Sequence, residues 1–161
     1  MFITKQRTYS FVNSKYIATE FDELINDTCG GGGRLFISKT DRHVYIDINN
    51  QSGECYSVSM YLEAIKFNPA SYNLECLGDM SLFYLPKKGS HYADYIEEDI
   101  LKYEFFVDLR NKLILIGDMY AKGLCYQFFK DTYCIINNGN IKLLIIKVDK
   151  DILQHIKLDN V

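Results

Sequence analysis

Residues 14–28 carry apolar side chains at the spacing of one helical face. The apolar stripe comprises Ile17, Phe21, Leu24, Ile25 and Thr28. Positions separated by three or four residues meet on the same side of an α-helix, and the acidic residues between them fall mostly on the other sides. Ser14 has a side chain suited to the N-cap position. The pattern predicts a helix over 14–28.

Three other segments show a similar helical period. The period in residues 57–67 runs through Val58, Tyr61, Leu62 and Ile65. Pro69 would end that helix, because the residue before a proline avoids the α region. Residues 91–101 place Ala93, Ile96, Ile100 and Leu101 on one side of a short helix. Residues 149–158 place Ile152, Leu153 and Ile156 at the same spacing, so this last helix is expected to cover a face of a sheet.

Most of the remaining chain alternates apolar and polar positions, or forms short apolar runs, between turn residues. Such segments are typical of β-strands. They are residues 34–38, 43–48, 72–77, 82–85, 103–109, 112–118, 124–129, 132–136 and 141–148. Asn138-Gly139, between the last two, is a strong signal for a two-residue hairpin turn. Short turns of this kind connect antiparallel neighbours.

The pattern therefore predicts an α+β fold: an antiparallel sheet built from hairpins, with about three to four helices packed on it. The chain has 161 residues and only two prolines, Pro69 and Pro86, and no Pro/Ser-rich linker divides it. We expect residues 1–161 to form a single α+β domain that is large enough to bury its own core.

The charge of the chain limits the kinds of molecule that it is expected to bind. The sequence has 18 basic and 21 acidic residues, a formal net charge of −3, and no basic run longer than Lys87-Lys88. Nucleic-acid binding needs clustered Lys and Arg, so no nucleic-acid partner is expected. The aliphatic runs at 113–116 and 143–146 are too short to cross a bilayer, and the N-terminus lacks the features of a secretory signal. We expect a cytoplasmic protein without membrane contact.

Residues 28–34, TCGGGGR, raise the question of phosphate binding. A phosphate-binding glycine loop leads from a strand into a helix, so that the helix N-terminus faces the anion. Here the predicted order is helix, glycines and strand, and no Gly-Lys-Ser/Thr sequence follows. The glycines are therefore expected to join the helix over 14–28 to the next strand.

Cys29 is a candidate nucleophile, with His43 as its base and Asp41 or Asp47 as the group that orients the imidazole. Cys29 lies at the C-terminus of a predicted helix, where the negative end of the helix dipole raises the pKa of a thiol. We therefore expect a buried structural cysteine. A small thiol-dependent hydrolase using Cys29 and His43 is the enzymatic alternative.

The other cysteines and histidines do not form a metal-binding motif. The five cysteines are Cys29, Cys55, Cys76, Cys125 and Cys134. An odd count with wide, irregular spacing is typical of reduced thiols rather than of a disulfide framework. Cys125 and Cys134 lie on neighbouring predicted strands and could face each other across the hairpin. No C-x-x-C or H-x-x-x-H sequence occurs, and His91 and His155 are isolated, so neither a metal site nor a cofactor is expected.

Residues 91–104, which we call the acidic tyrosine segment, concentrate the negative charge. They contain five acidic residues and one lysine, a formal charge of −4, whereas the whole chain carries −3 and the remainder therefore +1. A solvated acidic face is one interpretation. The other is a binding surface, because tyrosine is enriched in interfaces and carboxylates attract a basic partner. The predicted partner-binding residues are Tyr92, Asp94, Tyr95, Glu97, Glu98, Asp99, Tyr103 and Glu104.

Residues 19–38, TEFDELINDTCGGGGRLFIS, followed by many hairpins, resemble the small immunity proteins of bacterial toxin systems, especially contact-dependent growth inhibition. The resemblance implies a cytoplasmic, non-enzymatic α+β domain that binds and blocks a cognate toxin domain, commonly a nuclease. The acidic tyrosine segment would cover the cationic surface on which such a toxin holds phosphates. A sheet edge at residues 34–38 is a second possible docking route. A structural or regulatory subunit of another assembly is the remaining alternative.

Overall fold

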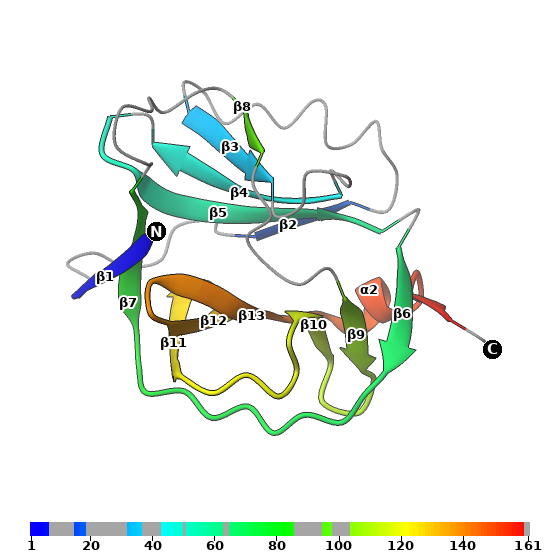
Figure 1. Ribbon diagram of the computed structural model, residues 1–161. Helices are drawn as coiled ribbons and strands as arrows, with labels where there is room; N and C mark the ends of the chain where they lie inside the picture. Colours follow the sequence, from blue (N-terminus) through cyan, green and yellow to red (C-terminus); the bar gives the residue numbers. More distant parts are fainter. Residues whose placement is uncertain are drawn as a thin grey trace.

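The computed structural model describes residues 1–6, 15–18, 32–36, 43–49, 51–62, 65–85, 95–97 and 104–159. Two sheets of seven strands each lie one above the other, as Figure 1 shows. The helical content of the described residues is one short helix, α2 (Lys150–Leu153). No helix in this part of the chain is long and apolar enough to cross a bilayer.

The first sheet is organised around its long strand β5. Its strands are β1 (Phe2–Gln6), β2 (Lys15–Ala18), β3 (Gly32–Phe36), β4 (Val44–Asn49), β5 (Glu54–Tyr61), β7 (Met80–Tyr84) and β8 (Tyr95–Glu97). They lie in the order β1-β7-β5-β4-β3-β8, and β2 also pairs with β5. The pairs β2–β5 and β3–β8 are parallel, whereas the other neighbours are antiparallel.

The second sheet consists mostly of hairpins from the last third of the chain. Its strands are β6 (Lys66–Pro69), β9 (Phe105–Asp108), β10 (Leu113–Gly117), β11 (Leu124–Phe129), β12 (Thr132–Asn137), β13 (Asn140–Lys147) and β14 (Lys157–Leu158). They lie in the order β11-β12-β13-β10-β9-β6-β14. The hairpins β9–β10, β11–β12 and β12–β13 confirm the strands predicted from residue 103 to residue 148.

The main core lies between the two sheets. Val44, Ile46 and Ile48, which alternate along β4, pack there with Ile114 and Ile116 of β10. Alternate side chains of a strand point to opposite faces, so one face of each sheet supplies this core.

The second sheet is also apolar on its outer face. We call the buried side chains there the outer cluster; it comprises Leu113, Leu115, Cys125, Ile135, Leu143 and Ile145. Strands β10 and β13 are therefore buried on both faces, which explains why their sequences read as continuous aliphatic runs. An apolar sheet face of this kind is stable only when another segment shields it from water.

The β12–β13 connection is the two-residue turn that the sequence predicts. Asn138 and Gly139 have φ angles of 51° and 72°, as a type I′ turn requires. The Phe2 N–H donates to the Gly139 carbonyl at 2.8 Å, and a Cβ on Gly139 would approach the Met1 Cγ to 2.7 Å. The positive φ at Gly139 favours glycine, and the hydrogen bond from Phe2 connects β1 of the first sheet to this hairpin of the second.

The predicted α+β class is wrong, because the described residues form a mostly β structure of two sheets. Residues 15–18, 57–61 and 95–97, which the helical periods cover, are strands. The other residues of the predicted helices over 14–28 and 91–101 lie outside the described part of the chain. Residues 149–158 form only the single turn α2 and then β14, although the apolar side chains of this segment pack against the main core as expected.

Strand β5 shows why the helical period was misleading. Every side chain from Ser57 to Leu62 is buried, so this segment is covered on both faces of the sheet. Such a strand loses the alternation that marks a half-buried one, and the remaining apolar positions can match a helical period by chance. Tertiary burial, rather than local preference, decides the conformation.

Candidate functional site

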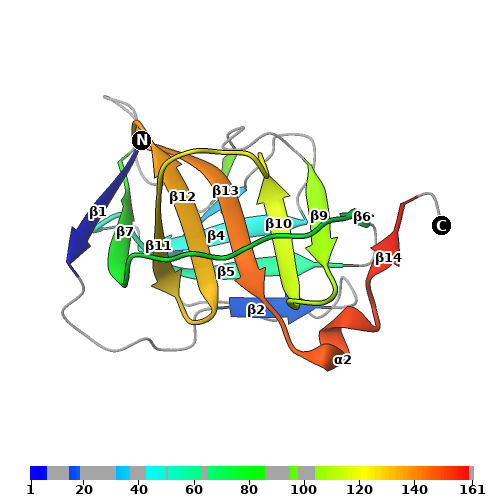
Figure 2. The same ribbon diagram turned by 90° about the horizontal axis from the view of Figure 1, so that it is seen from below.

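The segment between β6 and β7, residues 70–79, crosses the outer face of the second sheet, and we call it the strap. Figure 2 shows it passing over the strands from β9 to β11. Ala70, Tyr72 and Leu74 are half-buried against the outer cluster, whereas the side chains between them are exposed. The sequence predicts a strand over 72–77 from this alternation. The alternation correctly indicates one buried face, but residues 72–76 lie across the sheet, so the predicted strand over 72–77 is wrong.

Asp108, at the end of β9, anchors the first half of the strap. The residue is 2% exposed, and its carboxylate accepts hydrogen bonds from the Tyr72 N–H at 2.8 Å, the Asn111 N–H at 3.0 Å and the Asn111 Nδ2 at 2.8 Å. The Asn111 Nδ2 also donates to the Tyr72 carbonyl at 3.3 Å. Burial raises the pKa of the Asp108 carboxyl, but the hydrogen bonds from Asn111 and Tyr72 outweigh it and hold the pKa below its usual value.

Strand β11 holds the second half of the strap. The Leu77 N–H donates to the Cys125 carbonyl at 3.0 Å, and the Gln127 N–H donates to the Gly78 carbonyl at 2.9 Å. Asp79 then pairs with Gln127 in a parallel bridge. The strap is thus held at both ends: the Ala70 N–H donates to the Val107 carbonyl at 2.9 Å near the Asp108 anchor, and backbone hydrogen bonds to β11 hold the other end.

This register places Cys76 beside Cys125 and corrects the cysteine pair suggested by the sequence. On the β11–β12 hairpin, Cys125 faces Ile135, so it is out of register with Cys134. Cys134 packs in the main core, whereas Cys125 belongs to the outer cluster on the opposite face of the sheet. Burial, and then the neighbouring Cys76 thiol, raise the pKa of Cys125 to about 11.

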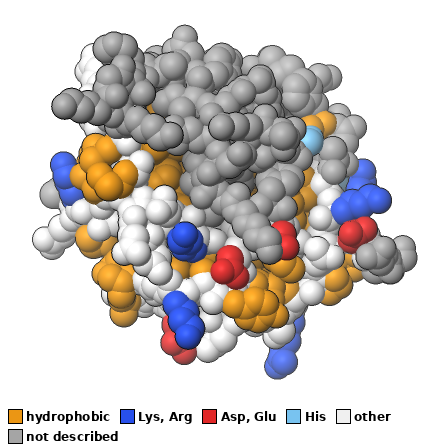
Figure 3. All heavy atoms as spheres, in the orientation of Figure 1, with side chains coloured by type: hydrophobic (Ala, Val, Ile, Leu, Met, Phe, Trp, Pro, Cys, Tyr) orange, Lys and Arg blue, Asp and Glu red, His pale blue; other side chains and the backbone are white. Residues whose placement is uncertain are grey.

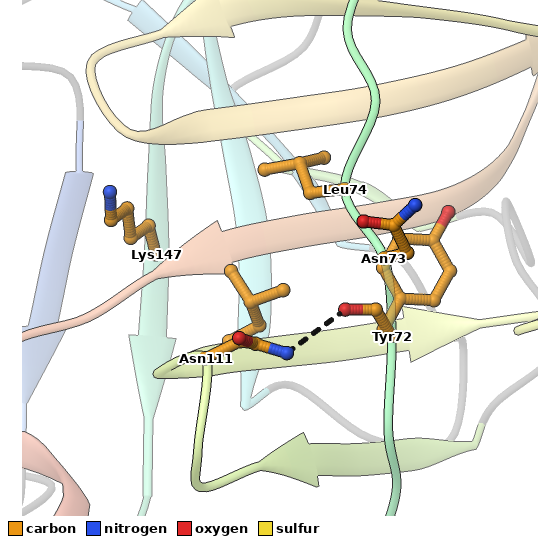
Figure 4. A pocket seen from close by; sticks show the side chains of 6 residues that line it. Tyr72, Asn73, Leu74, Asn111 and Lys147 are labelled. Carbon is orange, nitrogen blue, oxygen red and sulfur yellow. Dashed lines mark hydrogen bonds between the residues drawn. The ribbon is translucent and has the colours of Figure 1, made fainter.

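A small pocket opens between the strap and the second sheet, close to the Asp108 anchor. It has a volume of about 220 Å³ and is shown in Figure 4. Its lining comprises Tyr72, Asn73, Leu74, Asn111, Leu113 and Lys147. The Asn111 amide donates to Asp108 and to Tyr72, so it holds the strap in place. Pockets for organic ligands usually have volumes of about 300 Å³ or more. The dimensions therefore suit a few water molecules or a small ion better than an organic substrate.

A row of polar side chains lies on the face of the first sheet that points away from the main core. The row consists of the cross-strand pairs His43–Tyr61, Tyr45–Ser59 and Asp47–Ser57. The Ser57 hydroxyl donates to the buried Asp47 carboxylate, and the His43 ring stacks on Tyr61 with centroids 5.3 Å apart.

The spacing within this row bears on the proposed thiol chemistry. His43 and Asp47 are four positions apart along an extended chain, which separates their Cα atoms by about 13 Å. The Asp47 carboxylate therefore cannot orient the His43 imidazole, as the hydrolase hypothesis requires. Cys29 and Asp41, the other members of that hypothesis, lie outside the described residues.

Three of the predicted partner-binding residues can be placed. Tyr95 and Glu97 belong to β8, which pairs in parallel with β3, and Glu104 is half-buried just before β9. The acidic tyrosine segment therefore leads from the edge of the first sheet to the second sheet. The remaining predicted residues fall outside the described part of the chain: Tyr92, Asp94, Glu98, Asp99 and Tyr103.

The predicted sheet edge at residues 34–38 is wrong. Strand β3 has β4 on one side and β8 on the other, so it is an interior strand. Among the described strands, β8 ends the sheet on this side. The acidic tyrosine segment, rather than residues 34–38, supplies the edge strand.

Sequence reasoning did not single out the residues that hold the strap. Asp108 and Asn111 occur as D-L-R-N directly after a strand, a turn signal in which an Asp side chain accepts from a backbone N–H nearby. That signal locates the turn. It does not reveal Tyr72, which lies 36 residues earlier in the chain.

No protein-family model matches the chain, and neither the curated proteins nor the solved structures include one that is significantly similar to it. Within the described ranges, no three His, Cys, Asp or Glu side chains are grouped in a way that could hold a metal ion. The resemblance to immunity proteins therefore stays a prediction, and function has to be inferred from the arrangement of the residues.

Proposed function

We propose that this protein is a non-enzymatic inhibitor of the immunity type, which binds a basic protein toxin through the acidic tyrosine segment. The observation that carries the proposal is the position of Tyr95–Glu97 as β8, the last of the described strands on this side of the first sheet. The backbone groups on the outer side of an edge strand are able to pair with a strand of a partner. Here that edge lies within the most acidic part of the chain.

The negative charge of the acidic tyrosine segment accounts for the expected preference for a basic toxin. The segment carries a formal −4, while the rest of the chain sums to +1. A toxin that cuts nucleic acid must hold phosphates on a cationic surface. Carboxylates placed over that surface exclude the substrate, and their opposite charge speeds association. Inhibition of this kind requires no bond to be broken.

The support beneath β8 favours a binding role. Its neighbour β3 carries Leu35, which is fully buried in the main core, and β3 is itself paired to β4. An edge strand held on a well-packed sheet loses little conformational entropy on binding. The position of the segment in the fold is thus suited to docking.

The direct experiment is co-expression with the product of the neighbouring gene, followed by a growth-rescue assay and a pull-down. The variant Glu97→Ala, Glu98→Ala, Asp99→Ala is expected to bind more weakly, with a smaller dependence on salt, and to rescue growth poorly.

A matched control removes three exposed carboxylates at a distance along the chain, through Glu75→Ala, Asp149→Ala and Asp151→Ala. Both triple variants change the net charge equally, so only the position differs. The control should bind and rescue as the unmodified protein does. Equal affinity and equal salt dependence for all three proteins would exclude the acidic tyrosine segment as the binding surface.

A further inference from the structure

We propose that Cys76 of the strap and Cys125 of β11 form a reversible disulfide that fastens the strap to the second sheet, with a small-molecule disulfide such as oxidised glutathione as the oxidant. This modification site is independent of the proposed inhibitor function.

The backbone register brings the two cysteines together. The Leu77 N–H donates to the Cys125 carbonyl at 3.0 Å, which in a parallel arrangement places Cys76, the residue before the donor, opposite Cys125. Neighbouring extended chains lie about 4.8 Å apart, and a disulfide spans Cα atoms separated by about 4.4 to 6.8 Å. The Cα separation expected from this register therefore suits a disulfide.

The side chains also share one surface. Cys76 is exposed, and Cys125 is 8% exposed within the outer cluster directly beneath the strap. Burial first and then the adjacent Cys76 thiol raise the pKa of Cys125. Burial is also the main cause of the raised pKa of Tyr133, to which both thiols contribute. These effects agree with the register in making the two thiols neighbours.

The remaining described cysteines are not competitors. Cys55 and Cys134 are 4% and 0% exposed and pack in the main core, on the other side of the second sheet from the strap. Burial raises the pKa of both thiols, which disfavours the reactive thiolate. Among the described cysteines, Cys76 is therefore the one that an oxidant in solution reaches first.

The chemistry proceeds by two exchanges. The Cys76 thiolate attacks one sulfur of oxidised glutathione, forming a mixed disulfide and releasing one glutathione thiolate. Cys125 then loses its proton to water and attacks the Cys76 sulfur, forming the Cys76–Cys125 bond and releasing the second glutathione thiolate. Two protein thiols are oxidised and one glutathione disulfide is reduced to two thiols. The weak hydrogen bond from the Cys76 Sγ to the Gly78 carbonyl, 3.3 Å long, is lost.

Peptide mapping of the full chain provides the test, because trypsin separates the five cysteines onto different peptides. The folded protein is incubated with oxidised glutathione, blocked with iodoacetamide and digested. A cross-linked pair of peptides 67–87 and 123–130 is expected, and dithiothreitol added before blocking should abolish it. A stable glutathione adduct on Cys76, a link from Cys76 to any other cysteine, or unreacted Cys76 would overturn the proposal.

Two variants separate proximity from general reactivity. Cys76→Ser should yield no cross-link to peptide 123–130. In the matched control Cys76→Ser, Ser71→Cys, an equally exposed thiol lies elsewhere on the strap. It should stop at the glutathione adduct, because none of the described cysteines lies opposite position 71. An equal yield of cross-link from this control would show that strap mobility, not the register, determines pairing, and would refute the assignment.

Discussion

The Asp108 carboxylate accepts a 2.8 Å hydrogen bond from the backbone N–H of Tyr72, a residue 36 positions earlier in the chain. This contact joins the end of β9 to the strap. The same carboxylate accepts two hydrogen bonds from Asn111, so one buried acid orders both a turn and the segment that covers the second sheet. Figure 3 shows the molecule in the orientation of Figure 1, with apolar side chains interspersed with basic and acidic ones on the described surface.

Asp108→Ala should lower the free energy of unfolding by about 3 kcal/mol, because several donors lose a charged acceptor in a buried site. Urea unfolding followed by circular dichroism measures the loss. Asp118→Ala is the control, since the exposed Asp118 accepts one hydrogen bond from the Tyr120 N–H in a surface turn. Its loss should stay below about 1 kcal/mol. Equal losses would contradict the anchoring role of Asp108.

The Asp108 contribution should depend on pH. The pKa of its carboxyl is lowered in the folded protein, so its stabilising effect is complete above the unfolded pKa and is lost as pH falls through the folded pKa. The stability difference between the unmodified protein and Asp108→Asn should therefore be full near pH 7 and shrink below about pH 4. Urea titrations across this range test it; a difference that does not change with pH would disagree.

The raised pKa of Cys125 predicts that the folded protein becomes less stable at alkaline pH. The pKa of this thiol is raised from 9.0 to about 11, mainly by burial. Between these values the unfolded chain has lost the thiol proton while the folded chain retains it, so the free energy of unfolding falls as pH rises. Cys125→Ala should show a correspondingly shallower decline under reducing conditions, whereas an unchanged slope would mean that Cys125 ionises as freely as in the unfolded chain.

The Cys76–Cys125 disulfide should stabilise the oxidised protein by about 4 kcal/mol, the value expected for a closed loop of roughly 50 residues. The urea midpoint, measured with oxidised glutathione and with dithiothreitol, gives the difference. Cys76→Ser should have the same midpoint under both conditions. A midpoint that is unchanged in the unmodified protein, despite a mapped cross-link, would mean that the bond strains the folded state.

Gly117→Ala should be more damaging than Gly78→Ala. Both glycines have positive φ angles, 117° and 140°, so backbone strain is shared. A Cβ at Gly117 would lie 2.5 Å from the Lys142 carbonyl oxygen, whereas at Gly78 nothing lies within 4 Å. The close approach of β10 to β13 should add about 2 kcal/mol or more to the loss at Gly117. Thermal unfolding of the two variants compares their losses of stability. Equal losses would mean that the positive φ angle alone, without the close approach to Lys142, causes the damage.

The hairpins of the second sheet could be predicted because their information is local. Asn138-Gly139 determines a turn whose geometry matches the twist of the flanking strands, and the strands on either side follow within a few residues. The helices predicted over 57–67 and 91–101 were wrong where the structure describes them, because burial on both faces of β5 and pairing of β8 with β3 depend on distant segments.

For the candidate binding surface, too, the sequence reveals the local features but not the neighbouring strands. The charge and tyrosine content of residues 91–104 are evident in the sequence, but their place at the sheet edge is not. Residues 34–38 follow the run of glycines and were predicted as a possible sheet edge, yet β8 pairs with that side of β3. Alternation reports how many faces of a strand are buried and says nothing about which strand lies beside it.

Local residue patterns were thus sufficient to predict the turns and most strands in the last third of the chain. They also revealed the cluster of acidic residues that precedes those strands. The folded chain decided that two sheets replace one sheet with helices, that the strap covers the second sheet, and that Cys125 lies beside Cys76 instead of Cys134. The physical reason is the range of the interactions: turns depend on backbone angles of adjacent residues, whereas burial and strand pairing depend on contacts between residues tens of positions apart.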